Sequence, residues 1–336
     1  MCRHLAYLGE EVTIRSLLFE PPHGLVEQAW APRWQKHGTM NVDGFGLGWY
    51  AGADPQPARY RRSGPIWADD CLPDLARVTR TEAMLAAVRS ASVGTDMSAA
   101  SAAPYTQGRW LFSLNGALIG WSAAAGGSTT PRRRSAVSAT SAGAAVSADT
   151  AVPAGTAVSP GTEARPAERE ARAAAAGEPI TEPVPGIPAH LAESAAAVLR
   201  LAGRLSPADL LSLQARCDTA LLWALVLPRL RAGQRADDAL EDTVADIWAA
   251  GGTGRFNLLL TDGQQIAATA AGDSLCYQHR PGGVIVASEP SDDEPGWHQV
   301  PDGSVVRATR AGVAVRPIGQ AKPDATAIFQ GKALRP

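Results

Sequence analysis

Residues 1–9 read MCRHLAYLG, and Cys2 becomes the first residue of the chain once Met1 is removed. The thiol of an N-terminal cysteine can attack a carbonyl group. The free α-amine of the same residue has a pKa of about 8, so it can accept the thiol proton and return it. The identity of a residue at a terminus is often accidental. The rest of the chain therefore decides whether Cys2 is a nucleophile.

The overall composition excludes several classes of partner. The chain has 336 residues, a net charge of −2 and 45% hydrophobic residues, enough for one large core or two ordinary ones. This charge balance provides no excess of positive charge with which to bind nucleic acid or an anionic membrane. No apolar stretch approaches the roughly 18 residues of a membrane span, and the N-terminus has no secretory signal. We expect a cytoplasmic protein without nucleic-acid or membrane partners.

The four cysteines are far apart and form no CxxC pair, and the six histidines show no HxxxH spacing. This pattern argues against a zinc site and against a disulfide framework. We expect a reducing compartment and neither a metal nor a cofactor.

The middle of the chain changes in composition. Residues 135–162 contain one charged residue, Asp149, and no Leu, Ile or aromatic residue. Such a segment cannot bury enough apolar area to offset the entropy lost on ordering it. We predict one domain at 2–320, a disordered Ala/Ser/Pro-rich insertion at 123–187 within it, and a C-terminal tail at 321–336. The cost of closing a loop rises slowly with its length, so the domain can tolerate this insertion.

Strands are predicted on both sides of a group of helices. Aromatic and β-branched runs between turn residues predict strands at 5–9, 45–50, 58–64 and 109–121 before the insertion, and at 256–263, 265–271, 274–280, 283–290, 304–309 and 312–318 near the end. Helical patterns lie at 81–91, 190–205, 206–214, 218–233 and 237–250, with Ser206 as N-cap, Pro207 at the first helical position and Asp209 completing a capping box. This order fits a layered α+β protein with two packed sheets.

The segment MNVDGFGLGWY, residues 40–50, resembles a dinucleotide-binding loop only superficially. Gly44, Gly46 and Gly48 follow the pattern GxGxG, and Trp49-Tyr50 indicates a strand instead of a helix. Glycines that alternate with large residues in a strand indicate close approach of another backbone or of a ligand.

Two further motifs each have a structural and a functional interpretation. Asn115-Gly116 ends an apolar run; alone it favours a hairpin turn, but its side-chain and backbone N–H groups could also form an oxyanion hole. Arg89 with Ser92 could bind a carboxylate, or Arg89 could lie at an exposed helix end.

Asp218 and the Ser288-Glu289 pair are also open to two interpretations. Asp218 precedes an apolar helix, where an N-cap is the default, although its carboxylate could pair with an ammonium group. Ser288-Glu289 lies at the end of the predicted strand 283–290, and a structural turn is its favoured role.

Taken in order, Cys-Arg-His, DGFGLGWY, Arg-Ser-Ala-Ser, LNG, Asp-Thr and VASEP resemble the class II glutamine amidotransferase family of N-terminal-nucleophile hydrolases. The resemblance implies a four-layer αββα sandwich. It also implies roles for six residues: Cys2 as nucleophile with its own α-amine as base, Asn115 and Gly116 as oxyanion hole, Arg89 and Ser92 as α-carboxylate contacts, and Asp218 as α-amine contact.

Within that family the chain is most similar to the ergothioneine-biosynthesis amidohydrolases. This implies hydrolysis of the γ-glutamyl amide of γ-glutamyl-hercynylcysteine sulfoxide, a small-molecule substrate, without a required protein partner. The trimethylammonium group of that substrate suits an aromatic surface, for which Trp30, Trp34, Trp49 and Trp67 are candidates. The alternatives are a glutaminase subunit that supplies ammonia to a separate synthase, and a non-catalytic relative that binds a glutamyl ligand.

Overall fold

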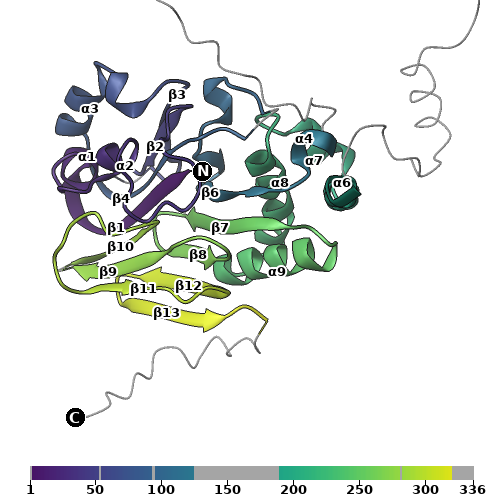
Figure 1. Cartoon of the computed structure of the whole chain (residues 1–336). Coiled ribbons are helices and arrows are strands. Elements are labelled where there is room, and N and C mark those ends of the chain that lie inside the picture. Colours follow the sequence, from purple (N-terminus) through teal and green to yellow (C-terminus); the bar gives the residue numbers. More distant parts are fainter. Residues whose placement is uncertain (1, 53, 93–94, 125–188, 281, 320–336) are drawn as a thin grey trace, which may run out of the picture. The chain divides into compact units, whose positions relative to one another are not determined.

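The structure is a computed structural model, and it describes residues 2–52, 54–92, 95–124, 189–280 and 282–319 (Figure 1). The chain divides into two units, residues 1–129 with 188–336 and residues 130–187, and the fold below is that of the first unit. Of the predicted insertion, residues 123 and 124 belong to a helix and the others lie outside the described residues, as does the predicted tail.

The strands of the described residues form two antiparallel sheets. The first sheet contains, in spatial order, β11 (Trp297–Gln299), β9 (Cys276–Arg280), β10 (Gly283–Ala287), β1 (Arg3–Thr13), β4 (Arg80–Val88), β2 (Phe45–Trp49) and β3 (Ala58–Arg62). The second contains β13 (Gly312–Pro317), β12 (Ser304–Thr309), β8 (Ile266–Ala270), β7 (Gly254–Thr261), β6 (Trp110–Leu118) and β5 (Tyr105–Gln107). The predicted strands before and after the helical region are therefore confirmed, whereas the short strands β5 and β11 were not predicted.

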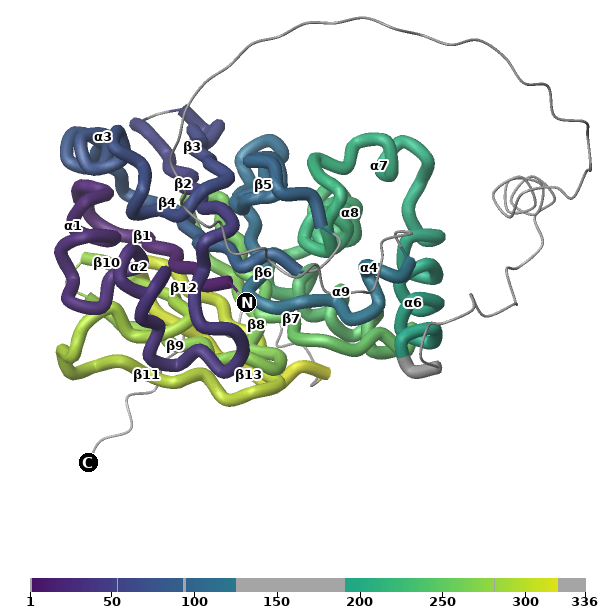
Figure 2. Tube along the Cα trace, turned by 45° about the horizontal axis from the view of Figure 1, so that its top comes forward, coloured from purple at the N-terminus to yellow at the C-terminus, as the bar shows by residue number. Residues whose placement is uncertain are grey.

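Helices cover the outer face of each sheet (Figures 1 and 2). The helices are α1 (Ile14–Leu18), α2 (Leu25–Gln28), α3 (Leu72–Val78), α4 (Trp121–Ala124), α6 (Ala189–Ala202), α7 (Pro207–Leu211), α8 (Asp218–Arg231) and α9 (Ala236–Ala249). Apolar side chains of α1, α2 and α3 pack on the first sheet, and those of α6, α8 and α9 pack on the second. The Ser206 N-cap is confirmed, since its side chain accepts a hydrogen bond from the backbone of Asp209.

Side-chain alternation along β1 shows how the layers form. Leu5 and Tyr7 face the helices, whereas Ala6 and Leu8 face the second sheet, as expected for a strand whose successive side chains point to opposite faces. The apolar layer between the sheets contains residues of β1, β4, β10, β6, β7, β8 and β12. Three apolar layers separate four layers of structure, so the predicted αββα sandwich is confirmed.

The helix predicted at 81–91 is wrong, because residues 81–88 belong to β4, which lies between β1 and β2 in the first sheet. Met84 and Ala86 pack under the helices, while Ala83 and Leu85 face the second sheet. A strand that is buried on both faces has a continuous apolar sequence, and such a run cannot be distinguished from a buried helix by its periodicity.

The glycines of β2 allow a neighbouring segment to approach closely, as their alternation predicted. A Cβ atom on Gly46 would overlap the carbonyl oxygen of Ala103, and one on Gly48 would lie 2.7 Å from the side chain of Leu111. The approach brings Ala103 against the first sheet, where it forms one wall of the pocket described below. None of the helices in the described ranges has the length and apolarity required to cross a lipid bilayer.

Candidate active site

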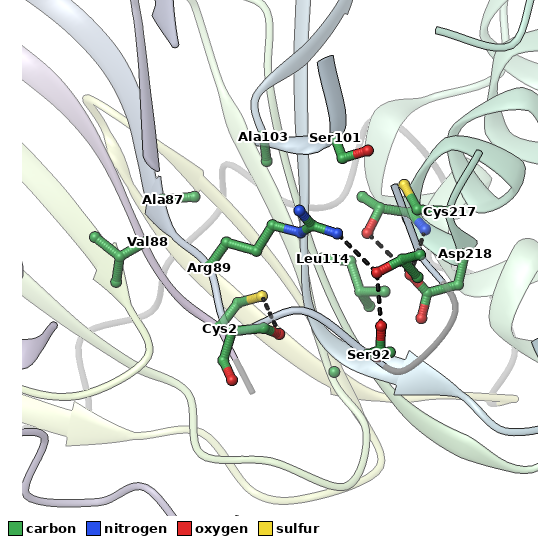
Figure 3. Close-up of a pocket in the computed structure, with 14 residues that line it drawn as sticks. Cys2, Ala87, Val88, Arg89, Ser92, Ser101, Ala103, Leu114, Cys217 and Asp218 are labelled. Atoms are coloured by element: carbon green, nitrogen blue, oxygen red, sulfur yellow. Dashed lines mark hydrogen bonds between the residues drawn. The ribbon is translucent and has the colours of Figure 1, made fainter. Parts of the chain in front are cut away.

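Five of the six predicted site residues line one pocket (Figure 3). These residues are Cys2, Arg89, Ser92, Gly116 and Asp218. Strand pairing explains part of this arrangement, since Arg3 of β1 lies opposite Val88 of β4 and so brings Cys2 beside Arg89. Gly116 comes from β6 in the second sheet, and Asp218 begins α8. Segments from both sheets and one helix layer thus meet at the pocket.

The thiol of Cys2 is half-buried at this pocket. Its Sγ lies 3.9 Å from the carbonyl oxygen of Ser90, which follows Arg89 at the end of β4. Met1 lies outside the described residues.

Arg89 is buried, and its guanidinium is held in a fixed orientation. Its Nη2 donates hydrogen bonds to Thr95 Oγ1 at 2.9 Å and to the carbonyl oxygen of Asp96 at 3.0 Å. Thr95 Oγ1 in turn donates to the carbonyl oxygen of Ser92 at 2.7 Å. Since Arg89 follows a strand, its interpretation as an exposed helix end is wrong. Sequence reasoning missed Thr95, although it lies only six positions after Arg89, because no sequence signal indicates which nearby hydroxyl the arginine will contact.

Asp218 is buried at the first residue of α8, and Cys217 occupies the N-cap, so the predicted N-cap at Asp218 is wrong by one position. Its Oδ2 accepts a hydrogen bond from the backbone N–H of Leu118 at 3.1 Å, and its Oδ1 accepts one from Thr219 at 2.8 Å. Burial raises the pKa of Asp218, although the two backbone N–H groups and Arg89 act in the opposite direction. A cation in the pocket would therefore favour the ionised carboxylate.

Asn115-Gly116 is not a turn, since β6 continues through it to Leu118. The backbone N–H of Ile119 bonds to Thr253 beside β7, whereas that of Leu118 bonds to Asp218 on the opposite edge. Backbone N–H groups alternate between the two edges of a strand, so the N–H of Gly116 points to the same edge as that of Leu118. This edge faces the pocket that Gly116 lines.

Asn115 is fully buried and is not one of the residues that line the pocket. Both ends of its carboxamide are satisfied only when Oδ1 accepts from Arg3 Nη1 and Ser288 Oγ, each at 3.2 Å, and Nδ2 donates to the carbonyl oxygen of Cys2. In the exchanged orientation only the bond between Nδ2 and Ser288 remains. A carboxamide nitrogen has two N–H donors. One of them donates to the carbonyl oxygen of Cys2.

A second thiol in the pocket, Cys217, has a different environment. It is buried, and its Sγ lies 3.0 Å from the hydroxyl oxygen of Tyr105. Burial, together with the charge of Asp218, raises the pKa of Cys217 to about 11. A thiol with so high a pKa is almost fully protonated near neutral pH, so it is a poor nucleophile.

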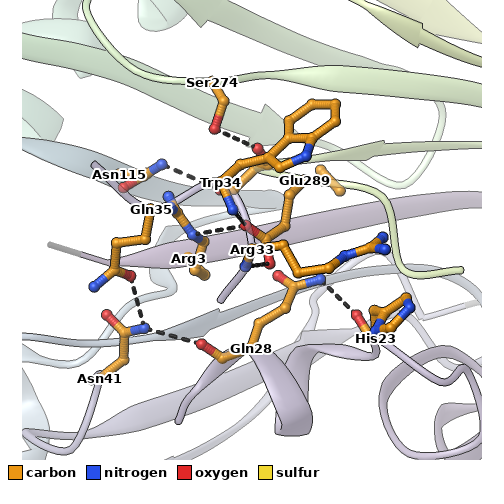
Figure 4. Close-up of polar contacts among 12 residues, drawn as sticks. Arg3, His23, Gln28, Arg33, Trp34, Gln35, Asn41, Asn115, Ser274 and Glu289 are labelled. Atoms are coloured by element: carbon orange, nitrogen blue, oxygen red, sulfur yellow. Dashed lines mark hydrogen bonds and ion pairs between the residues drawn. The ribbon is translucent and has the colours of Figure 1, made fainter. Parts of the chain in front are cut away.

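Sequence reasoning also missed a buried polar cluster that includes the two residues after Cys2, and we define it as Arg3, His4, Ser288 and Glu289. Figure 4 shows Arg3 and Glu289 of this cluster. Ser288 and Glu289 form a bend directly after β10, in agreement with the turn interpretation, and both are fully buried. Ser288 Oγ accepts a hydrogen bond from the backbone N–H of His4 at 3.0 Å. Burial, and to a lesser extent the charge of Arg3, lowers the pKa of His4 to about 3, so this imidazole is neutral.

The candidate tryptophans do not line the pocket in the described part of the chain. Trp30 and Trp67 form an exposed edge-to-face pair with ring centroids 5.4 Å apart, whereas Trp34 and Trp49 pack partly buried against the first sheet and its helices.

Solved structures that are similar to this fold include glutamine amidotransferases. The chain is similar to a glutamine amidotransferase class II domain protein from Silicibacter pomeroyi, with a TM-score of 0.54 and 17% identity over 95% of this chain and 100% of that chain. It is also similar to the glutamine phosphoribosylpyrophosphate amidotransferase of B. subtilis, with a TM-score of 0.50 and 12% identity over 95% of this chain and 50% of that chain. No protein-family model matches the chain. The fold is that of the class II glutamine amidotransferases, which are N-terminal-nucleophile hydrolases.

Curated sequences identify the family more closely. The γ-glutamyl-hercynylcysteine sulfoxide hydrolase of Mycobacterium tuberculosis is 32% identical over 322 residues, which are 96% of this chain and 99% of that protein. The enzyme of the same name from Mycolicibacterium smegmatis is 30% identical over 318 residues, 95% of this chain and 100% of that protein. The chain belongs to the γ-glutamyl-hercynylcysteine sulfoxide hydrolase family, and it is an amide hydrolase.

Proposed function

We propose that this enzyme hydrolyses the γ-glutamyl amide of γ-glutamyl-hercynylcysteine sulfoxide and releases glutamate and hercynylcysteine sulfoxide, as a step of ergothioneine biosynthesis in the cytoplasm. The observation that carries the proposal is the presence of Cys2, Arg89 and Asp218 in one pocket. The relatives named for this reaction match the chain over nearly its whole length and support the choice of substrate.

The charges of the pocket match those of a glutamyl group. Its α-carboxylate would pair with Arg89 and accept a hydrogen bond from Ser92, and its α-ammonium would pair with Asp218. Arg89 is already oriented by Thr95, so little side-chain entropy is lost when the carboxylate binds. These contacts would hold the γ-carbonyl carbon near Cys2.

The reaction would proceed through a thioester. The thiol of Cys2 gives its proton to its own α-amine, and the sulfur attacks the γ-carbonyl carbon. The developing oxyanion accepts hydrogen bonds from the second N–H of Asn115 Nδ2 and from the backbone N–H of Gly116. The C–N bond then breaks, and the leaving amine takes the proton from the α-ammonium of Cys2.

Water completes the cycle. It transfers a proton to the α-amine of Cys2 as its oxygen attacks the thioester carbon. The C–S bond breaks, the thiolate recovers its proton, and glutamate leaves. This scheme requires the removal of Met1, because only a free α-amine on Cys2 can serve as the base.

Release of glutamate tests the proposal. The purified enzyme is incubated separately with γ-glutamyl-hercynylcysteine sulfoxide and with glutamine, beside Cys2→Ala as control, and its mature N-terminus is determined by mass spectrometry. We expect the sulfoxide to be the better substrate, Cys2→Ala to be inactive, and the active protein to begin with Cys2. Equal or better turnover of glutamine would contradict the proposed substrate, and full activity with Met1 retained would contradict the mechanism.

A further inference from the structure

Arg3, the residue after the proposed nucleophile, forms an ion pair with Glu289 (Figure 4). Both side chains are fully buried, and Arg3 Nε lies 3.5 Å from Glu289 Oε2. Burying two charges is costly unless the pair makes further hydrogen bonds. Those further bonds connect the pair to Asn115 on one side and to a loop beside α2 on the other.

Arg3 contacts the oxygen end of the Asn115 carboxamide. The separation between Arg3 Nη1 and Asn115 Oδ1 is 3.2 Å in the orientation that satisfies both ends of the amide. The two ends of a carboxamide have nearly the same shape, so packing alone does not select between them. A guanidinium has only donors, so Arg3 favours the orientation in which oxygen faces it and nitrogen faces Cys2.

Glu289 holds Arg3 and also the loop. Its Oε1 accepts a hydrogen bond from the backbone N–H of Arg33 at 3.0 Å, and its Oε2 accepts one from that of Trp34 at 2.7 Å. The carboxylate therefore has three donors around it, which compensate for its burial. The guanidinium is fixed in turn by this anchored carboxylate.

We propose that Arg3 is a positioning residue for the hydrolysis and acts through Asn115, with Glu289 holding Arg3 in place. Arg3 keeps the Asn115 carboxamide turned so that an N–H, and not the carbonyl oxygen, meets the developing oxyanion. A carboxamide turned the other way would present a negative dipole end to that charge. The inference rests on the proposed function, because it assigns a donor to the oxyanion of that reaction.

A mutant cycle tests whether Arg3 acts through Asn115. The pair variant Arg3→Met with Glu289→Gln leaves no unpaired buried charge, and it is combined with Asn115→Ala. Loss of an oxyanion donor lowers kcat by about 100-fold or more, and we expect a loss of that order, with little change in KM, for the pair variant. In the Asn115→Ala background the same two substitutions should lower kcat by less than about threefold, because the effects of residues that act as a unit do not multiply. The proposal would be overturned if the kcat losses of the pair variant and of Asn115→Ala multiply when the substitutions are combined, or if the pair variant has an unchanged kcat.

Two further variants separate positioning from stability. Arg3→Lys keeps a charge for Glu289 but lacks the planar fork that reaches two partners, so we expect a folded protein with reduced kcat. Arg316 pairs with Asp238 and Glu241 on α9, outside the pocket. Arg316→Met should lower the melting temperature without changing kcat. A kcat loss in Arg316→Met equal to that in the pair variant would assign the effect to stability and refute the positioning role.

A chloroketone analogue of glutamine distinguishes this inference from the proposed function. It carries a chloromethyl group in place of the amide nitrogen, and Cys2 forms an S–C bond as chloride leaves. If the native enzyme hydrolyses no γ-glutamyl amide, the proposed function fails, and the same cycle is then measured as the rate of Cys2 alkylation. The positioning role would be supported if the pair substitutions slow alkylation of Cys2 in the native background but do not slow it further in the Asn115→Ala background. Equal rates in all variants, or no alkylation, would overturn it.

Discussion

Asp218 Oδ2 accepts a hydrogen bond from the backbone N–H of Leu118 at a distance of 3.1 Å. The bond connects the start of α8 to β6, the strand in which Gly116 lies two residues before Leu118. The carboxylate proposed to hold the substrate ammonium and the N–H proposed to meet the oxyanion are therefore fixed on the same edge of β6.

Replacement of Asp218 by Asn should weaken binding more than it slows the chemistry. The variant loses the charge that would pair with the α-ammonium, and a hydrogen bond to a charged group contributes roughly 1.5–3 kcal/mol. We expect KM for the γ-glutamyl substrate to rise by about 10–100-fold with a smaller change in kcat. Steady-state kinetics of glutamate release measure both. A fall in kcat at unchanged KM would contradict the assignment.

The pH dependence of stability should also report Asp218. Burial raises its pKa in the folded state above the unfolded value. The native state then binds more protons between the two pKa values, so this contribution to stability is fully present below the unfolded pKa and is lost as pH rises through the folded pKa. Relative to the wild type, Asp218→Asn should gain melting temperature as pH rises from about 4 to 8. A difference in melting temperature between Asp218→Asn and the wild type that stays constant over this pH range would contradict the raised pKa.

Arg89→Lys should raise KM strongly, because an ammonium cannot reproduce the planar guanidinium that contacts both Thr95 and Asp96. We expect a rise of about 10-fold or more, and about threefold for Thr95→Val, which removes only the orienting hydroxyl. The control is Thr309→Val, a change of the same type near the β12–β13 hairpin and outside the pocket. Loss of activity in Thr309→Val equal to that in Thr95→Val would remove the support for an orienting role.

Gly116→Ala should damage both the fold and the activity. A Cβ at this position would overlap the backbone carbonyl of Arg255 in β7, and the strand pairing leaves little freedom to move. Overpacking typically costs about 1–3 kcal/mol, which denaturant unfolding can measure. Gly312→Ala is the matched control, since a Cβ there meets nothing within 4 Å. Equal stability of the two variants would contradict the predicted overlap.

The four cysteines should differ in their reaction with iodoacetamide near neutral pH. Cys71 is exposed and Cys2 is half-buried, whereas Cys217 and Cys276 are buried, with pKa values that burial raises. Only thiolate that the reagent can reach is alkylated. We expect peptide mass spectrometry of the native protein to find label on Cys2 and Cys71. Rapid labelling of Cys217 would show that the pocket exposes a second reactive thiol.

The sequence was sufficient to predict those elements whose local chemistry agrees with the fold. Ser206, Pro207 and Asp209 form an N-terminal helix signal that requires no tertiary contact, and it was predicted correctly. The alternation of glycine in β2 likewise indicated the close approach at Gly46. β4 was missed because both of its faces are apolar, which removes the period of two that identifies a strand.

The details of the site depended on contacts between distant segments. The ordered motifs indicated which residues share a pocket, but nothing near Asn115 shows that its carboxamide lies behind Cys2 and contacts Arg3. Nor does the sequence around Glu289 show that its carboxylate anchors backbone N–H groups some 255 positions earlier. Such partners are set by the packing of the two sheets, which local patterns do not encode.

The contact at Gly120 has a consequence for how the enzyme can be built. A Cβ on Gly120 would lie 2.5 Å from the backbone nitrogen of Ala195. The segment that ends with α4, at residue 124, therefore lies against the segment that begins with α6, at residue 189. One segment contributes Cys2 and Arg89, and the other contributes Asp218. The candidate site is thus composite, and two separately produced fragments, each inert alone, should reconstitute it when β10 pairs with β1 and β7 pairs with β6.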